Sequence, residues 1–290
     1  MVALSSQRTT IDGVGRLIAI VLFIALMVPA AMLARGWSLA SGRRAVASAG
    51  VEFVPATPEA TAQLARQATH AHRVRLLGLL LGVALVVTTV VLFAEASVFL
   101  WVPALAVGLL GGVLLAEATR PRPSWATSSP ARRPRRSEQI SLVLLWTMRA
   151  AVAGVVLTAL LQLDDLTSPV VSVATAVPLA GWLLAEAALL RVLLRPLPAA
   201  GADVPVDEAQ RTWTAHLSVA AASVLALLPL GALLLRAAID LDDRVTSDGA
   251  GLLPVALVAG GFSAIIAGLV VAGFLLTWLR PVRQTSHALA

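Results

Sequence analysis

Three charged residues stand out because they lie inside or directly beside long apolar stretches of the chain. Arg149 and Glu186 each interrupt such a stretch, and Glu117 lies close to the end of another. Ionisable groups at membrane depth are costly, so they usually pair with one another or mark an ion or substrate path. As binding residues, these three could form a cytoplasm-facing path for an ion, a proton or an anionic substrate. The alternative is a structural ion pair.

The depths of Arg149 and Glu186 can be compared by counting residues from the turn that joins their two apolar stretches. At 1.5 Å per helical residue, both lie roughly 20 to 26 Å from that turn. The long side chains are therefore predicted to meet. Glu117 has a further alternative, because a carboxylate near a helix end beside Arg120 can extend to the membrane interface.

The sequence offers little sign of catalytic or metal-binding patterns. The sequence contains no H-E-x-x-H, G-x-S-x-G, Walker A or dinucleotide-binding pattern. It has no cysteine, which excludes disulfides and thiolate metal sites. His70 and His72 are two apart and do not share a helical face, and the aspartates of 240–248 lack the glutamate of a calcium loop. We expect no catalytic residue, no metal and no cofactor.

The elements that position the three charges must be membrane-spanning helices. Hydrophobic residues make up 58% of the chain and charged residues 13%, about half of the charged share of a soluble domain. Because hydrocarbon offers no hydrogen-bond partners, each span must be a helix of about 20 apolar residues. Seven stretches meet this requirement: 17–34, 76–94, 97–116, 140–163, 170–190, 215–235 and 252–279.

The distribution of arginine gives these spans a direction. The chain has no lysine, and most of its 22 arginines follow the first, third, fifth and seventh stretches. The positive-inside rule places those segments in the cytoplasm. We therefore predict an all-α polytopic transmembrane bundle of seven spans, with the amino terminus outside and the carboxyl terminus inside. The opposite loops are acidic, with Glu95, Asp164, Asp165, Asp240, Asp242, Asp243 and Asp248.

The domain organisation follows from the spans. Residues 1–34 form an amino-terminal segment and first anchor, although the end of this span also resembles a signal-peptide cleavage site. Residues 35–75 form a cytoplasmic segment, whose helix is predicted to start near Pro58 and to run into the second span. Residues 76–283 form a six-span bundle of three hairpins, and 284–290 form a cytoplasmic tail.

Two patterns within the spans concern packing. Residues 112–118 and 181–187 share the pattern Gly-x-Leu-Leu-Ala-Glu-Ala, which indicates related hairpins or a chance match in an Ala- and Leu-rich chain. Small residues also recur at four-residue spacing, which allows close helix contact within one chain, with a protein partner or in a homo-oligomer. These positions are Gly78 and Gly82, Gly108 and Gly112, and Gly260, Ala264, Gly268 and Ala272.

Composition narrows the class of function. The net charge of +6 is explained by the positive-inside rule and by contact with the anionic headgroups of the lipid bilayer, so we expect no nucleic-acid partner. Arginine without lysine is typical of a GC-rich bacterium. We expect a non-enzymatic multi-pass protein of the bacterial inner membrane, such as a scaffold, accessory or partner-binding component. The alternative is a small transporter or permease component with a polar path near Arg149 and Glu186.

Overall fold

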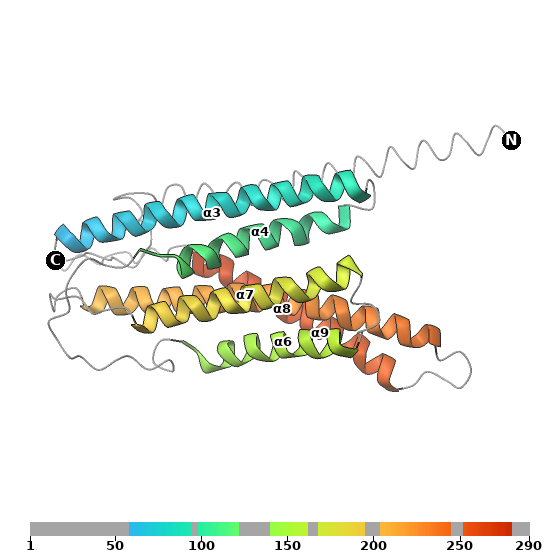
Figure 1. Ribbon diagram of the computed structural model, residues 1–290. Helices are drawn as coiled ribbons and strands as arrows, with labels where there is room; N and C mark the ends of the chain where they lie inside the picture. The colour runs from blue at the N-terminus through green and yellow to red at the C-terminus, as the bar shows by residue number, and fades with distance from the viewer. Residues whose placement is uncertain are drawn as a thin grey trace, which may run out of the picture.

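The structure is a computed structural model of the 290-residue chain. It describes residues 58–93, 98–121, 140–161, 168–194, 204–244 and 252–279. Within these ranges the regular elements are all helices, and Figure 1 shows them as long rods packed side by side. They are α3 (Pro58–Phe93), α4 (Val98–Ala118), α6 (Leu142–Leu161), α7 (Pro169–Leu194), α8 (Val204–Arg244) and α9 (Leu252–Leu279).

All six described helices are long and apolar enough to cross a membrane. Helix α9 has the bounds predicted for the seventh span, and α3 begins at Pro58 and runs without a break into the second span, as predicted. Pro58 suits the first helical position because its missing N–H has no partner there in any case. The first predicted span, 17–34, lies outside the described residues.

Helix α8 differs most from its predicted bounds. The apolar stretch covers 215–235, but the helix has 41 residues, a length of about 60 Å. The prediction that Asp240, Asp242 and Asp243 belong to an outer loop is therefore wrong, because they lie in the last turns of α8. An apolar stretch marks only the part of a helix that suits hydrocarbon. The helix continues beyond it, where Arg236 and Asp240 form an i,i+4 ion pair at 3.6 Å.

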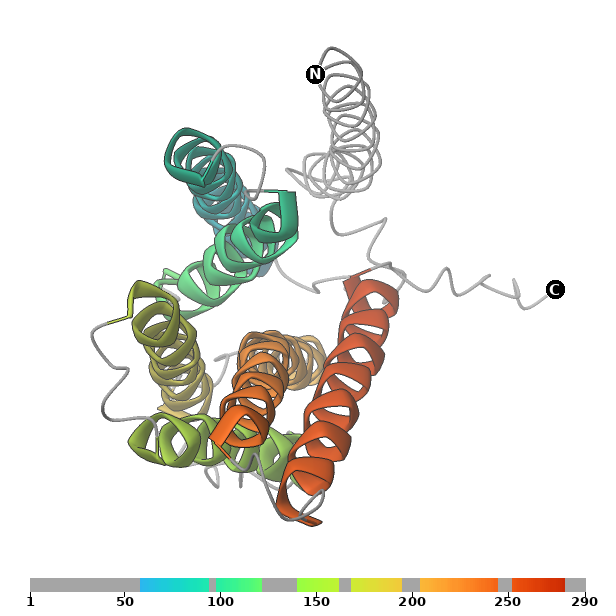
Figure 2. The ribbon, with the colours of Figure 1, turned by 90° about the vertical axis from the view of Figure 1, so that its right-hand side faces the viewer.

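Helix α8 lies at the centre of the bundle and packs against α9, α7, α6 and α4. Its most apolar window is 72% buried, against 17% for α9 and 22% for α3. A run of small residues at Ala220, Ala221 and Ala222 is fully buried and allows neighbouring helices to approach on several sides. In Figure 2, α8 (orange) lies between α7, α6 and α9, with the α3–α4 pair to one side.

Glycines set the distance between α3 and α4. A Cβ atom built on Gly78 would lie 2.5 Å from the Cα of Gly112, and one on Gly82 would lie 3.3 Å from the Cα of Gly108. The backbones therefore touch where a side chain would keep them apart. The two predicted glycine faces pack against each other within one chain.

The contact between α8 and α9 is also close, and it uses part of the predicted face together with residues beside that face. A Cβ atom on Gly231 would lie 2.7 Å from the carbonyl oxygen of Gly261 and 2.5 Å from Cγ1 of Ile265. Of the predicted positions, Ala264 is buried and Gly268 packs on Leu228, while Gly260 and Ala272 are only partly buried. The close approach depends on Gly231, whose partner could not be identified from spacing along a single helix.

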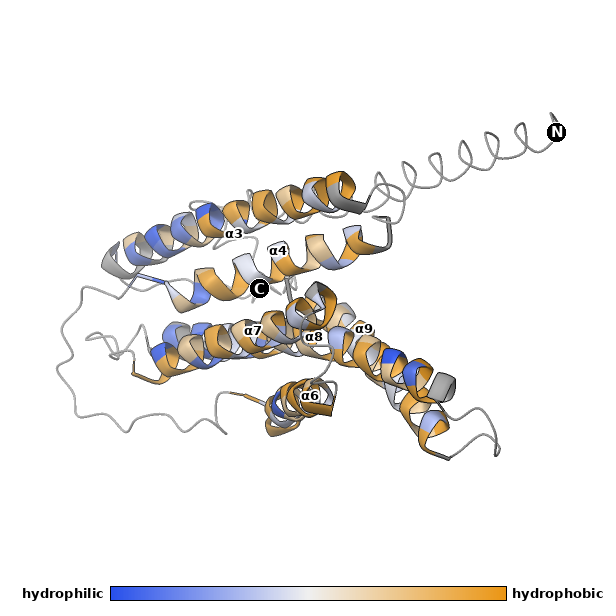
Figure 3. Cartoon of the chain, turned by 45° about the vertical axis from the view of Figure 1, so that its right-hand side comes forward, coloured by the Kyte–Doolittle hydropathy of each residue, from blue (hydrophilic) through white to orange (hydrophobic). Residues whose placement is uncertain are grey.

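The outward faces of the helices are apolar. Val91, Val143 and Leu161 are each more than three-quarters exposed, at 77%, 77% and 79%. Contiguous surfaces of this kind are rare on soluble proteins and are stable when hydrocarbon covers them. Figure 3 shows hydrophobic residues along the middle of the helices and hydrophilic residues towards their ends.

Candidate functional site

Most of the buried charges lie at one end of the bundle, where α6 and α8 begin and α4, α7 and α9 end. The amino-terminal half of α3 passes along the same end. This region is called the polar end below. It is defined by Arg75, Glu117, Arg120, Arg191, Asp207 and Arg211.

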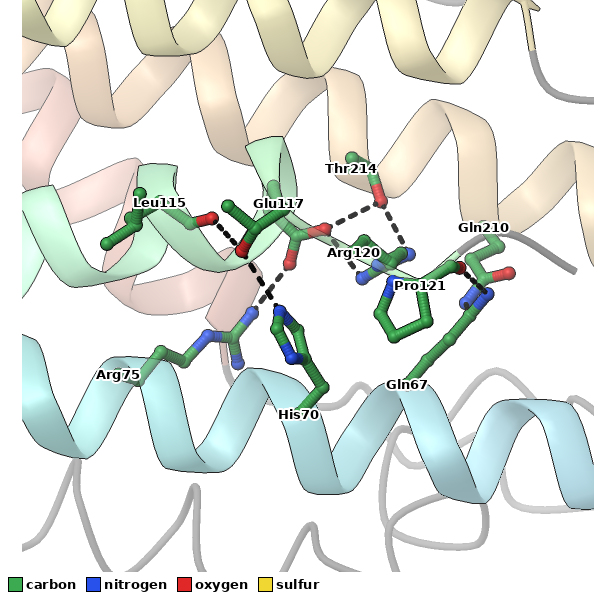
Figure 4. A network of polar contacts seen from close by, with 10 residues as sticks. Gln67, His70, Arg75, Leu115, Glu117, Arg120, Pro121, Gln210 and Thr214 are labelled. Carbon is green, nitrogen blue, oxygen red and sulfur yellow. Dashed lines mark hydrogen bonds and ion pairs between the residues drawn. The ribbon is translucent and has the colours of Figure 1, made fainter.

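Glu117 is the centre of the largest polar cluster. Its side chain is fully buried, with Oε1 accepting a hydrogen bond from Nη2 of Arg75 at 2.9 Å. Its other oxygen, Oε2, lies 2.6 Å from Nη2 of Arg120. Thr214 of α8 donates to Oε2 at 3.4 Å and accepts from Nη1 of Arg120 at 3.1 Å (Figure 4). One carboxylate thus joins three helices.

This burial excludes one of the alternatives for Glu117. The carboxylate does not extend to the membrane interface, because its side chain is 0% exposed. Arg75 and Thr214 enclose it from α3 and α8. Neither partner is near Glu117 in the sequence. The sequence therefore indicated only the contact between Glu117 and Arg120, which lie three residues apart.

Arg191 of α7 closes the carboxyl end of α4. Its Nη1 donates to the carbonyl oxygen of Ala118 at 2.7 Å, and its Nη2 donates to that of Arg120 at 3.4 Å. The last carbonyls of a helix lack partners within the helix, and the helix dipole attracts a cation there. Arg191 therefore caps α4 and fixes it to α7. From the sequence, the distribution of arginine predicts only that Arg191 lies on the cytoplasmic side.

Helix α3 makes further polar contacts at this end (Figure 4). Nε2 of His70 lies 3.0 Å from Oγ1 of Thr119, and Nε2 of Gln210 donates to Oε1 of Gln67 at 2.8 Å. His70 is therefore hydrogen-bonded to the residue that follows the end of α4. Buried glutamines at helical spacing on α3 are the signal that could have identified this packed face, since Gln63 and Gln67 are both 2% exposed.

A second buried ion pair lies within α8. Nε of Arg211 donates to Oδ2 of Asp207 at 2.6 Å, and the two side chains are 1% and 2% exposed. Nη1 of Arg211 also donates to the carbonyl oxygen of Val192 on α7. A buried pair of this kind is tolerated only when hydrogen bonds offset the loss of water. The apolar stretch 215–235 does not include Arg211, so the pair could not be predicted from hydropathy.

The pair predicted from depth joins α6 and α7. Nη2 and Nε of Arg149 donate to the same oxygen, Oε1 of Glu186, at 2.8 Å and 3.3 Å. The predicted contact between the two side chains is confirmed. They are 32% and 17% exposed, and the Arg149 guanidinium lies 5.7 Å from the ring centroid of Trp146. Glu117 has a different set of partners on other helices.

Between the ends of the helices, hydroxyl groups mostly bond to their own backbone. Thr147, Thr158, Thr175 and Ser223 each donate to the carbonyl four residues earlier, at 2.8 to 2.9 Å. This arrangement satisfies a hydroxyl in apolar surroundings. Ser218 has a buried Oγ atom without a hydrogen-bond partner in the described structure. Among the described residues, no group of three or more His, Asp or Glu side chains is placed to hold a metal ion.

Six apolar helices with lipid-facing surfaces and polar ends define the class: an integral membrane protein with several helical spans. The chain matches no protein-family model, no curated protein and no solved structure. Its function is therefore inferred from the helices and their ion pairs.

Proposed function

We propose that this chain is a non-enzymatic scaffold, accessory or partner-binding component of a bacterial cytoplasmic membrane. The proposal rests on the observation that buried and partly buried carboxylates are paired with arginines. Glu117, Asp207 and Glu186 each accept hydrogen bonds from an arginine at 2.6 to 3.3 Å. Such pairs hold helices in fixed positions, because breaking a buried pair leaves an uncompensated charge.

The proposed topology has seven spans, the amino terminus outside and the carboxyl terminus inside. The polar end carries Arg73, Arg191 and Arg211, whereas the other end of α8 carries Asp240 and its neighbouring aspartates. This asymmetry agrees with the positive-inside rule.

Single-cysteine labelling tests the topology, since the chain contains no cysteine of its own. A membrane-impermeant maleimide should label Asp248→Cys on intact spheroplasts and Arg73→Cys only after permeabilisation. Labelling of Arg73→Cys from outside would reverse the proposed orientation.

The surfaces open to a partner are limited by packing within the chain. The glycine faces of α3 and α4 are occupied by each other, so they are not available to another protein. Helices α3 and α9 have the least buried apolar windows. A partner helix or a second copy would therefore contact their outward faces.

A transporter is the second candidate, and the Arg149–Glu186 pair favours it because the pair lies within the spans and is partly exposed. Proton and solute flux in proteoliposomes separates the two candidates. The scaffold proposal predicts no flux above protein-free vesicles and a stoichiometric partner after affinity purification from native membranes. Flux that disappears in Arg149→Gln would establish the transporter instead.

A further inference from the structure

We infer that Arg149 and Trp146, beside Glu186, form a binding site for the phosphate of a glycerophospholipid on the outer surface of α6 and α7. The inference requires that the chain lies in a bilayer, but it does not depend on the scaffold proposal. It assigns a ligand to a charged pair that, among the described residues, is partly exposed within the spans and joins two helices.

The level of the Arg149 guanidinium suits a lipid headgroup. Arg149 lies about 10 Å along α6 from Leu142, the first residue of the helix. Helical side chains lean towards the amino-terminal end, and the Arg149 guanidinium accordingly lies over Trp146, one turn nearer the start of α6. The Trp146 side chain is 63% exposed. Because tryptophan prefers the headgroup level, the guanidinium lies near the boundary between headgroups and acyl chains.

The guanidinium has donors left for an anion. Its hydrogen bonds to Glu186 come from Nε and one N–H of Nη2, which is less than half of the N–H groups that arginine carries. The Arg149 side chain remains 32% exposed, so part of it is open to a lipid. Arginine is the side chain best suited to phosphate, since two of its N–H groups can bind two oxygens at once.

Exposed apolar side chains continue from the pair towards the middle of the helices. On α6, Ala153, Leu157 and Leu160 follow Arg149 on one helical face; Leu157 is 60% and Leu160 54% exposed. Leu183 of α7, one turn from Glu186, is 60% exposed. The strip from Arg149 to Leu160 spans about 16 Å, roughly half of the hydrocarbon thickness. Its length matches an acyl chain in one leaflet.

The other ion pairs do not offer such a site. Glu117 and its arginines are shielded from lipid by α3 and α8. Arg236 and Asp240 are more exposed than Arg149 and Glu186, at 36% and 40%, but they pair at 3.6 Å within a single helix. This second pair provides a matched control for the effect of removing an exposed arginine.

Native mass spectrometry of the full-length protein in detergent, titrated with phosphatidylglycerol, tests the site. Arg149→Gln should weaken binding about tenfold, the effect of losing a charge-assisted hydrogen bond. Glu186→Gln should strengthen binding, because the carboxylate that competes with phosphate for the guanidinium is gone. Arg236→Gln should leave binding unchanged. The opposite signs at Arg149 and Glu186 separate a lipid site from a purely structural ion pair.

Three results would overturn the inference. One is equal weakening by Arg149→Gln and Glu186→Gln, which indicates an ion pair that only maintains the fold. The others concern the ligand: inorganic phosphate bound as tightly as phosphatidylglycerol indicates a free anion, and diacylglycerol bound equally well indicates apolar contact alone. If Arg149→Gln does not fold, Glu186→Gln remains decisive, and unchanged or weaker binding there rejects the site. Partner co-purification tests the proposed function separately.

Discussion

Glu117 and Glu186 occupy the same place in the shared pattern Gly-x-Leu-Leu-Ala-Glu-Ala, yet the structure puts them in different surroundings. Glu117 is completely buried and is bound by two arginines and a threonine. Glu186 is 17% exposed and is bound by Arg149, beside an exposed tryptophan. A local pattern thus determines that a carboxylate lies near the end of a span. Neighbouring helices determine what that carboxylate does.

The glycine that opens each pattern shows the same contrast. Gly112 touches the backbone of Gly78, which brings α3 close enough for Arg75 to reach Glu117. Gly181 instead packs against a side chain, because a Cβ atom built there would lie 3.2 Å from Cδ1 of Leu225. On α7 a side chain, not a backbone, lies against the glycine, and Glu186 stays partly exposed beside the arginine that α6 supplies. The backbone contact at the glycine therefore distinguishes the closed cluster from the accessible one.

The largest expected effect is at the closed cluster. Glu117→Gln leaves Arg75 and Arg120 buried without a counter-charge, and breaking a buried pair in this way costs about 3–5 kcal/mol. We expect a severe loss of folded protein and a large fall in thermal stability in detergent, followed by circular dichroism. Glu186→Gln is the matched variant in the related pattern and should cost much less. Equal losses in the two variants would contradict the contrast between the clusters.

A steric change between α3 and α4 should rank next. Gly108→Ala places a Cβ atom against the backbone of Gly82, and overpacking of this kind costs about 1–3 kcal/mol. Gly111→Ala is the matched control on the same helix, because a Cβ atom there meets nothing within 4 Å. Thermal unfolding should separate the two variants clearly. A stable Gly108→Ala protein would mean that the α3–α4 contact can relax without loss.

The contrast also explains which parts of the structure were predictable. The Arg149–Glu186 contact followed from counting residues, because α6 and α7 are consecutive and the turn between them fixes their relative depth. The Glu117 cluster did not, because Arg75 and Thr214 come from helices that a single sequence cannot place around α4. Similarly, hydropathy located α9 but not the polar ends of α8, where the helix leaves the apolar stretch.

A double-mutant cycle measures the accessible pair itself. Removing Arg149 and Glu186 singly and together should give a coupling free energy of about 0.5–1 kcal/mol, because both side chains are partly exposed and screening weakens their attraction. The same cycle on Arg75 and Glu117 should give a larger value, since both are buried. Unfolding in detergent provides the free energies. Additive losses for Arg149 and Glu186 would show that the contact contributes nothing to stability.

The smallest effect should be at the far end of α8. Arg236→Gln removes an arginine that is 36% exposed and lies 3.6 Å from Asp240, a geometry worth at most about 0.5 kcal/mol. Its unfolding midpoint should therefore match that of the unmodified protein. If Arg236→Gln is as destabilising as Arg149→Gln, then joining two helices adds nothing to an exposed ion pair. The contribution of an ion pair to stability would then depend only on how exposed its side chains are. The two ends of the bundle would differ only because the pairs at the polar end are more buried.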